Sequence, residues 1–579
     1  MVSKAVLKRF YVVFGWLGIA GLAVVVWYSP LVFKGYNATI TASDNLVRAR
    51  NFAYTGRYAT ENQLNVVLAP ELIKDQAVTS NYGNKWGSIF YGYLIRWVHP
   101  SSNQAIIFIN CIILALALLV FTIAIYYTWG SLMAFIFALV YIFLPTNWSL
   151  AQMLVDYELA LLFFALFLLF FSFGTKKFSS LESDTDNFKF FPQGLWLIVA
   201  GIFLILAGVA KEAFFIILPI LFGYLLLFRL KQYLVYVFAT VVILWSVLWL
   251  PGFLAGQNTY LLFFTSHTTE SLKSSDYSYY AHLFPDPYIY HFDRDNFLKQ
   301  KLNFSGSDAM WRLGREKVLA NMGQGEVNLW QRLKIGTALA LRHVFRFFSI
   351  TEIGGPLITL LLILGWLALK KRSDHWFNFS CWWVFGSIVL ISYVTLAGRN
   401  HLMDFGWLIA LGVASGVLFL SDVLAKYFMV SKKAVIIVLT LLTIYDLIIC
   451  SHVMWGQAYD NSPMIKLNYY FDKIAQANLR PDEVIASGTG VDEIYNLNFN
   501  TNKSIVAFRP ETIERLLAEN KLEEVFVRFG VKAILGYSPE LSQKIIGKTK
   551  AGLIADDVLP SQEKVIKVNN QNWFMNLVR

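Results

Sequence analysis

The sequence predicts a polytopic α-helical membrane protein that ends in a small α/β domain. Of its 579 residues, 56% are hydrophobic and only 15% are charged, whereas an ordinary soluble chain carries about 25% charged residues. Many apolar runs approach or exceed the ~18 residues typical of a membrane-spanning helix. After about residue 457 the apolar runs shorten, and strand-like segments alternate with helical ones, as in an α/β domain.

The apolar runs predict about eleven spans. Residues 10–28 follow a basic N-terminus and are longer than a signal-peptide core, so we expect an uncleaved span with a cytoplasmic N-terminus. One helix over residues 194–228 would be about 50 Å long against a hydrocarbon core of ~30 Å, so this stretch must form two spans that break at Lys211-Glu212. The expected spans are 10–28, 104–127, 131–145, 157–173, 194–210, 213–228, 233–251, 355–369, 377–397, 405–421 and 434–452.

The basic residues agree with this topology, because short cytoplasmic loops carry an excess of Lys and Arg. The loops that fall inside are 175–177, 229–231, 370–372 and 426–433. The net charge of +11 is therefore explained by span ends and anionic headgroups, and nucleic acid is not an expected partner. Two large external loops, 29–103 and 252–353, lie within a transmembrane domain of residues 1–456, which precedes an extracytoplasmic α/β domain of residues 457–579.

The α/β domain is predicted from the last 120 or so residues of the chain. Residues 483–487 are followed by a Gly-Thr-Gly turn and resemble a strand, as do residues 532–536. Helices are expected at 510–522 and 522–529. Gly488-x-Gly490 is only a fragment of a dinucleotide fingerprint, because Glu493 stands where the third glycine belongs, and we therefore reject a nucleotide site.

Ionisable side chains stand between the apolar runs, where a bilayer makes them costly, at roughly 2.5–3.5 kcal/mol each if they reach its centre. Asp44 follows the first span, and Asp156 and Glu158 precede or begin the fourth. Lys211 interrupts the apolar stretch 194–228, and Arg399 precedes the tenth span. Charges that recur at the outer ends of spans indicate a polar cavity at one membrane face. Such a cavity suits chemistry or transport on lipid-borne or polar substrates.

Each of these side chains also has a structural interpretation. Asp44 caps a predicted helix and can pair with Arg48 at i,i+4, or it is a general base at the mouth of the bundle. Asp156 and Glu158 point about 200° apart on a helix, so only one of them faces a cavity easily. Lys211 either lies in a turn and extends its ammonium to the membrane surface, or binds a lipid phosphate. Arg399 either lies in a solvated turn or binds a phosphate through two guanidinium N–H groups.

The large loops contain histidines that suit a metal. His267 and Glu270 are the best-spaced pair, at i,i+3, with His282 and His291 further along. No tight ligand motif surrounds them, so the spacing favours a structural or solvent-facing role over a metal site.

Several short motifs of this chain resemble those of the multi-spanning GT-C glycosyltransferases, a group that includes protein O-mannosyltransferases and the aminoarabinose transferases of lipid A. The motifs occur in the same order along the chain and on the same side of the membrane. Asp44 is followed by a helix and a "GxYA"-like stretch at 51–59, and a "YGP"-like segment is matched by 82–87 without its proline. The segments 211–219 and 399–401 match a "K-x-x-x-hydrophobic-P" element and an "R-Y/N" loop. The resemblance covers most of residues 1–420, and segment 522–536 resembles an element of the group's outer domains.

The resemblance implies inverting transfer of a sugar from a polyprenyl-phosphate donor to an acceptor at the outer face of a membrane, which we expect to be a bacterial inner membrane. Asp44 would be the general base, and Asp156 or Glu158 would assist it, orient the acceptor or hold a divalent cation. Lys211, Arg399 and Lys85 would bind the donor phosphate. The resemblance leaves the sugar open, and the acceptor could be a glycan, a lipid or a protein.

Two alternatives use the same residues differently. A transporter or flippase of a lipid-linked sugar would use the charges for binding alone, but the paired helix breaks typical of such proteins are not found in the sequence. A non-enzymatic scaffold with a partner-binding outer domain would tolerate Asn at position 44.

Overall fold

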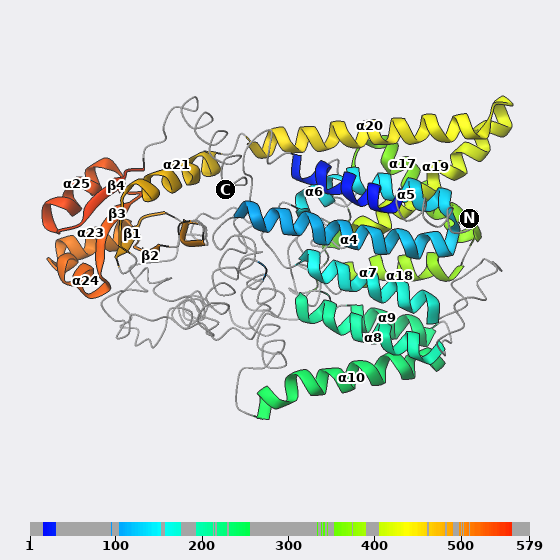
Figure 1. Ribbon diagram of the computed structural model, residues 1–579, viewed down its shortest axis with the longest axis horizontal. Coiled ribbons are helices and arrows are strands. Elements are labelled where there is room, and N and C mark those ends of the chain that lie inside the picture. The colour runs from blue at the N-terminus through cyan, green and yellow to red at the C-terminus, as the bar shows by residue number, and fades with distance from the viewer. Residues whose placement is uncertain are drawn as a thin grey trace, which may run out of the picture.

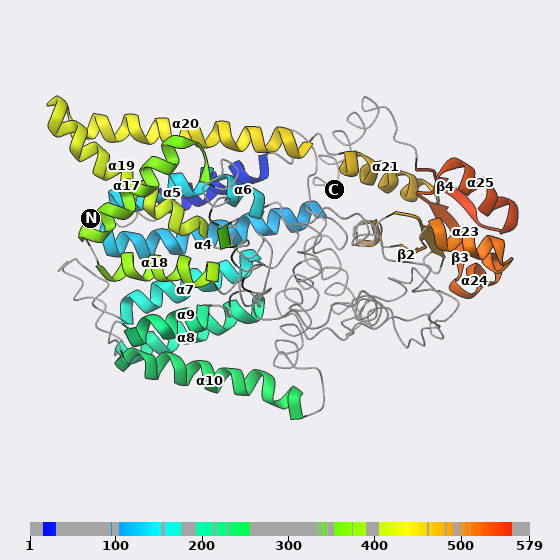
Figure 2. The same ribbon diagram turned by 180° about the vertical axis from the view of Figure 1, so that it is seen from behind.

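A computed structural model describes two parts of the chain, a bundle of apolar helices and a C-terminal α/β unit (Figures 1 and 2). The described residues are 15–29, 103–151, 157–174, 193–211, 217–227, 231–254, 353–372, 374–389, 405–459, 462–480, 483–489, 497–499, 503–508 and 510–557, with a few single residues between them.

Each predicted apolar run contains a helix. These helices are Gly15–Ser29, α4 (Asn103–Trp129), α5 (Ser131–Phe143), α7 (Tyr157–Gly174), α8 (Gln193–Ala210), α9 (Ile217–Leu227), α10 (Lys231–Leu254), α17 (Pro356–Arg372), α18 (Asp374–Val389), α19 (Gly406–Phe428) and α20 (Lys432–Tyr459). Among the described helices, 4 are long and apolar enough to cross a bilayer unaided. The chain is a membrane protein, and the number of spans and the position of the termini stay predictions.

The predicted break in the long apolar stretch is confirmed. Helix α8 ends at Ala210 and α9 begins at Ile217. Between them, the Phe214 N–H donates to the Lys211 carbonyl at 2.9 Å, which closes a tight turn. Lys211 therefore stands at the junction of two helices, where its backbone leaves the helical path.

The C-terminal end of α5 shows how carbonyl groups are satisfied in an apolar bundle. Pro145 has no N–H, so the Tyr141 carbonyl lacks its i+4 helical donor and instead accepts the Asn147 side-chain amide at 2.6 Å. Both Trp27 and Trp148 donate their indole N–H to the Ile142 carbonyl, at 2.8 and 2.9 Å.

The next carbonyl of α5 belongs to Phe143, and the Ser451 hydroxyl of α20 donates to it at 3.3 Å. Successive carbonyls are thus bound by side chains of the first helix, the short helix α6 (Pro145–Ala151) and α20. An unsatisfied carbonyl in hydrocarbon costs several kcal/mol, so these bonds fix the end of α5 among its neighbours.

Helices α17 and α19 meet backbone to backbone. A Cβ atom at Gly365 would overlap the Gly412 carbonyl oxygen, and one at Gly416 would overlap the Leu361 carbonyl oxygen. Gly412 and Gly416 form a GxxxG pair, the spacing that lets membrane helices approach closely. Because backbone atoms lie on both sides of the contact, no rotamer change could make room for a side chain.

Asp446 of α20 is an ionisable residue inside a predicted span that the sequence analysis did not identify. Its carboxylate lies against Gly355, 2.5 Å from where a Cβ atom would be. It accepts hydrogen bonds from the Gly355 and Ile358 backbone N–H groups at the start of α17. The helix dipole favours an anion at this end, so Asp446 caps α17 from a neighbouring helix.

The C-terminal unit is a parallel sheet of four strands in the order β2-β1-β3-β4. The strands are β1 (Val484–Ser487), β2 (Ser504–Ala507), β3 (Val531–Leu535) and β4 (Gly552–Ala555). β1 and β3 lie at the predicted strands, whereas β2 and β4 were not predicted. The helices are α21 (Ser462–Gln476), α23 (Pro510–Ala518), α24 (Leu522–Phe529) and α25 (Pro539–Lys548), and α23 is shorter than the expected helix over 510–522.

Both faces of the sheet are covered. Side chains of α23, α24 and α25 pack on one face in a core that includes Phe508 and Ile534, and α21 packs on the other face through Leu467 and Tyr470. Figure 1 shows α21 on the opposite side of the strands from α23 and α24. This three-layer arrangement is an α/β fold.

Gly488 is required by the close approach of β1 to the turn after β3. A Cβ atom at Gly488 would lie 2.7 Å from the Tyr537 ring and 2.8 Å from the Gly536 carbonyl oxygen. The Gly488 N–H donates to the Leu535 carbonyl at 3.0 Å. This glycine therefore serves strand packing, and Tyr537 occupies the space above it.

The carboxyl of Asp472 on α21 gives the unit a pH dependence. Burial raises its pKa, and neighbouring Lys473 only partly opposes the rise. Below the ordinary aspartate pKa of about 3.9, both the folded and the unfolded chain are protonated. As the pH rises through the interval up to the raised pKa, the unfolded chain loses its proton first, so stability falls.

We expect Asp472→Asn to raise the melting temperature of the purified protein at neutral pH, because the variant removes a partly buried charge. The gain should disappear at pH values below the ordinary aspartate pKa. Thermal unfolding of variant and wild type at both pH values measures the effect, and a variant that melts lower at neutral pH would contradict it.

Candidate functional site

The start of α7 and the end of α8 bring buried charges to one end of the bundle. Glu158, in the first turn of α7, is 0% exposed, and Lys211, directly after α8, is 8% exposed. The Lys211 ammonium lies over the Tyr157 ring, 4.8 Å from its centroid. A cation over an aromatic face gains about 2 kcal/mol when desolvated, which helps to hold Lys211 in an apolar surrounding.

Glu158 and Tyr157 face different neighbours. Tyr157 contacts the α8–α9 turn, with its ring centroid 6.4 Å from that of Phe214. Glu158 lies on the side of Cys111 of α4, a residue that is itself fully buried. The two consecutive residues of α7 therefore present a carboxylate toward α4 and an aromatic support for Lys211 toward α8 and α9. We call Tyr157, Glu158, Lys211 and Phe214 the α7 site.

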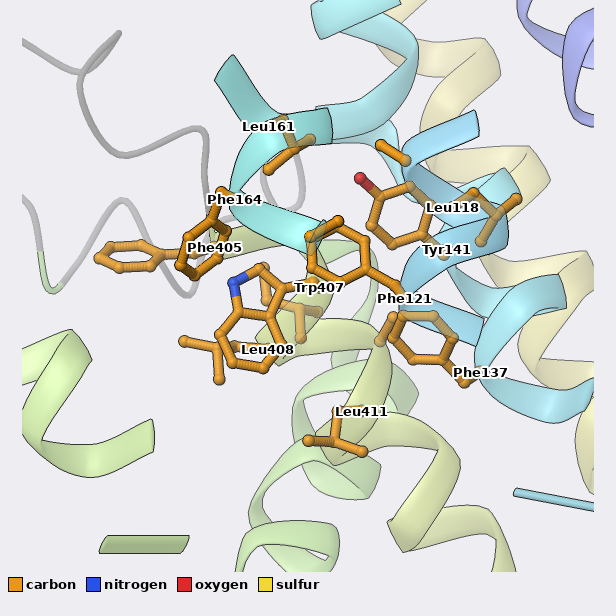
Figure 3. Close-up of a cluster of buried hydrophobic side chains, with 14 of the residues drawn as sticks. Leu118, Phe121, Phe137, Tyr141, Leu161, Phe164, Phe405, Trp407, Leu408 and Leu411 are labelled. Atoms are coloured by element: carbon orange, nitrogen blue, oxygen red, sulfur yellow. The ribbon is translucent and has the colours of Figure 1, made fainter. Parts of the chain in front are cut away.

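Aromatic rings from several helices pack together next to Phe214 of the α7 site, and Figure 3 shows part of this cluster. The Phe164 ring is 5.9 Å from both Phe214 and Trp407, and it stacks on Trp383 at 4.9 Å. Trp407 in turn stacks on Phe121 at 5.9 Å. Figure 3 shows Phe121, Phe164 and Trp407 meeting from α4, α7 and α19.

Asn147 joins this region to the start of α19. Its side chain is fully buried, and its Oδ1 atom has no hydrogen-bond partner in the structure as described. A Cβ atom at Gly406 would lie 2.5 Å from that oxygen, so only glycine fits there. Asn147 of α6 therefore packs directly against the first residue of α19.

The structure describes two of the predicted site residues, Glu158 and Lys211, and both are buried at the same end of the bundle. The other predicted residues lie outside the described ranges: Asp44, Lys85, Asp156, His267, Glu270 and Arg399. The predicted convergence of Asp44 and Arg399 with this site therefore stays a prediction. Within the described ranges there is no group of three or more His, Cys, Asp or Glu side chains suited to a metal, and the His267–Glu270 site also stays a prediction.

The sequence analysis did not identify the partners that hold the α7 site. Tyr157, Phe214 and Asn147 were not chosen, although each is adjacent to or near a charged candidate in sequence. Tyr157 could have been chosen, because it is an aromatic residue next to a charged residue, Glu158, at the end of a predicted span. Nothing local to Asn147 indicates that it contacts Gly406, because the two lie on helices far apart in the chain.

Chemically, the α7 site offers an anion-binding group and a proton-accepting or orienting group in a surrounding of low polarity. Coulombic interactions are stronger there than in water. Lys211 can neutralise a phosphate, and Glu158 can accept a hydrogen bond or a proton, or hold a cation. These are the groups needed by a reaction in which negative charge develops on a phosphate at the membrane.

Comparisons with solved structures return membrane glycosyltransferases of the kind that the sequence resembles. One is the oligosaccharyltransferase AglB from Archaeoglobus fulgidus, in complex with an inhibitory peptide and a dolichol-phosphate, with 14% identity, a TM-score of 0.47, and coverage of 91% of this chain and 69% of that one. Another is ArnT from Cupriavidus metallidurans bound to undecaprenyl phosphate, with 13% identity, a TM-score of 0.48, and coverage of 93% and 90%. No family model and no curated protein sequence matches the chain. At these identities and TM-scores, the similarities transfer neither an activity nor a site residue.

Proposed function

We propose that this protein is a glycosyltransferase that moves a sugar from a polyprenyl-phosphate donor to an acceptor at the outer face of a membrane, with inversion at the sugar carbon. The observation that carries the proposal is the α7 site, where a buried ammonium and a buried carboxylate stand at one end of an apolar bundle. Ionisable groups in such a place are costly and usually functional.

The position of the site suits a lipid-borne substrate. A polyprenyl-phosphate sugar keeps its chain in the hydrocarbon, so its reactive carbon stays near the membrane surface. In transfer, the bond between that carbon and the phosphate oxygen breaks, and the electron pair leaves with the phosphate. Lys211 stabilises this developing charge, with Arg399 and Lys85 as further candidate cations. Preorganised charge of this kind is often the largest contribution to catalysis.

The attacking acceptor hydroxyl must lose a proton as the new bond forms. Asp44 is the proposed general base, at the outer mouth of the bundle. Asp156 or Glu158 assists it, orients the acceptor or holds a divalent cation. The burial of Glu158 supports a role inside the bundle rather than at the lipid interface.

The sidedness of the proposal rests on the basic loops. Figures 1 and 2 place the α19–α20 hairpin, with its ion pair between Lys432 and Asp422, at the end of the bundle away from the α/β unit. Positive residues favour the cytoplasmic side. The opposite end, with α6 and the α/β unit, is then extracytoplasmic.

A transfer assay tests the function. We expect Asp44→Asn to lower turnover of a labelled polyprenyl-phosphate sugar by about 10²–10⁴-fold, the usual contribution of a general base, with the melting temperature unchanged. Asp422→Asn, at the other end of the bundle, is the matched control and should retain turnover.

The assay also separates the alternatives. A flippase would move the labelled donor across a vesicle membrane without releasing the polyprenyl phosphate, and a scaffold would show neither activity. Wild-type protein that transfers no sugar to any acceptor of a glycan, lipid and protein panel would overturn the proposal.

A further inference from the structure

The connection between α19 and α20 carries the most exposed large apolar side chains of the described chain. Met429 is 94% exposed and Tyr427 is 80% exposed, and Phe428 and Val430 are exposed as well. The Tyr427 and Phe428 rings meet edge to face, with centroids 5.0 Å apart. We call residues 427–430 the hairpin tip, and Figures 1 and 2 show this connection extending beyond the ends of the neighbouring helices. Four consecutive exposed apolar residues indicate a surface that another molecule covers.

The backbone of the hairpin tip supports the same conclusion. Met429 ends α19 in a left-handed conformation, with φ of +53°. Glycine or asparagine is usual at such a position, because other side chains are strained there. The other two described non-glycine residues with positive φ are both asparagines, Asn478 and Asn520. A methionine that is strained and almost fully exposed gains nothing within the fold, so its side chain serves a contact outside it.

The charges around the hairpin tip are mostly positive. Lys426 precedes the tip, and Lys432 and Lys433 follow it; all three side chains are exposed. Asp422 is the only acidic residue between positions 422 and 433, and it forms an ion pair with Lys432. Lys426 and Lys433 therefore leave a net positive charge beside the apolar surface, which selects an anionic partner.

The length of α20 places the hairpin tip at the surface of the bilayer. Its 28 residues form a helix about 42 Å long, which exceeds the hydrocarbon core of ~30 Å and matches a whole bilayer of about 40–45 Å with its headgroups. The exposed face of α20 continues from the tip along the helix as a stripe of apolar side chains. This stripe contains Ile437, Val438, Leu441, Leu442, Tyr445, Ile448 and Ile449. The lipid that covers the stripe is thus continuous with the layer at the tip.

We infer that the hairpin tip docks on the anionic phospholipid headgroups of the membrane that the bundle spans. Tyr427, Phe428 and Met429 lie at the boundary between headgroups and acyl chains, where aromatic side chains are favoured. Lys426 and Lys433 bind the lipid phosphates. A protein partner could also cover apolar residues, but the continuity of the tip with the lipid-facing stripe favours lipid. The inference is independent of the proposed transferase function.

Fluorescence quenching in vesicles of phosphatidylcholine and phosphatidylglycerol tests where the hairpin tip lies. Met429→Cys, in a Cys381→Ala background that removes the exposed thiol, carries a bimane fluorophore on the full-length protein. We expect a nitroxide on the lipid headgroups to quench it and aqueous iodide to leave it bright. Ile546→Cys in α25 of the α/β unit is the matched control, and iodide should quench its bimane.

The result at a second position, Val430→Cys, should agree with that at Met429→Cys, which guards against a local effect of one label. Iodide quenching at both tip positions as strong as at Ile546→Cys would place the tip in water. That outcome overturns the inference and leaves a protein partner as the occupant of the apolar surface.

The choice of anionic lipid is tested with the same fluorophore. At equal mole fraction, nitroxide-labelled phosphatidylglycerol should be enriched at the tip over phosphatidylcholine by about tenfold or more, because each lysine near an anionic surface favours binding by about fivefold. Lys426→Gln with Lys433→Gln should abolish the preference. Lys544→Gln with Lys548→Gln removes two exposed lysines of α25 and should retain it. Equal quenching by the two lipids when all the lysines are present would overturn the inference.

Discussion

Replacing Gly365 with alanine is expected to destabilise the helix bundle by about 3 kcal/mol or more, at or beyond the upper end of the usual cost of overpacking. The new methyl group would overlap the Gly412 carbonyl oxygen, and the Gly416 amide nitrogen also lies close to it. Relief requires α17 and α19 to separate, which opens the packing along both helices. Thermal unfolding of the purified protein in detergent measures the loss.

Gly18→Ala provides the matched control. Gly18 is also a glycine within an apolar helix, but a Cβ atom there has no neighbour within 4 Å. The control should leave stability unchanged or raise it by up to about 1 kcal/mol through helix propensity. If Gly365→Ala melts at the same temperature as Gly18→Ala, the backbone contact between α17 and α19 is wrong.

Replacing Lys211 with methionine is expected to lower kcat/KM for sugar transfer by about 10²–10³-fold, as when one preorganised donor to a developing anion is removed. Methionine retains much of the apolar stem that packs at the α7 site and loses only the charge. Because the ammonium acts on the leaving phosphate, the loss should appear in kcat as well as in KM. Steady-state kinetics with a polyprenyl-phosphate sugar measures both.

Lys473→Met is the control for a lost cation over an aromatic ring. Lys473 lies over the Tyr469 ring of α21 at 5.7 Å, a similar arrangement in the α/β unit. It should leave kinetics unchanged. A Lys211→Met enzyme with wild-type kcat would show that Lys211 serves packing or topology and would remove it from the mechanism.

Hydrophobic length predicts most of the bundle, because a run of apolar residues in lipid has little choice but a helix. Length shows that residues 194–228 need two helices, since one would be too long for the hydrocarbon core, and the charged pair Lys211-Glu212 locates the break. The short strands β2 and β4 of the α/β unit were not predicted. Each is only four residues long, and its strand conformation depends on pairing with β1 or β3.

Two residues of the candidate site were singled out from the sequence, whereas their neighbours and arrangement were not. Charges between apolar runs identified Glu158 and Lys211, because such positions are costly in a bilayer. The aromatic support from Tyr157 and the contact of Asn147 with Gly406 could not be predicted, since they depend on which helices are neighbours. The contact of the GxxxG pair on α19 with Gly365 on α17 was likewise not predicted, because it also depends on which helices are neighbours.

The carbonyl groups at the end of α5 have a consequence for biosynthesis. Helix α5 enters the membrane early, but the hydroxyl that binds its last carbonyl belongs to Ser451, 308 residues later in the chain. Until α20 leaves the ribosome and inserts, that carbonyl has no Ser451 donor and must find water, lipid or an insertase. Assembly of the bundle is therefore completed from its last span, and nascent chains that stop short of α20 should remain substrates for membrane quality control.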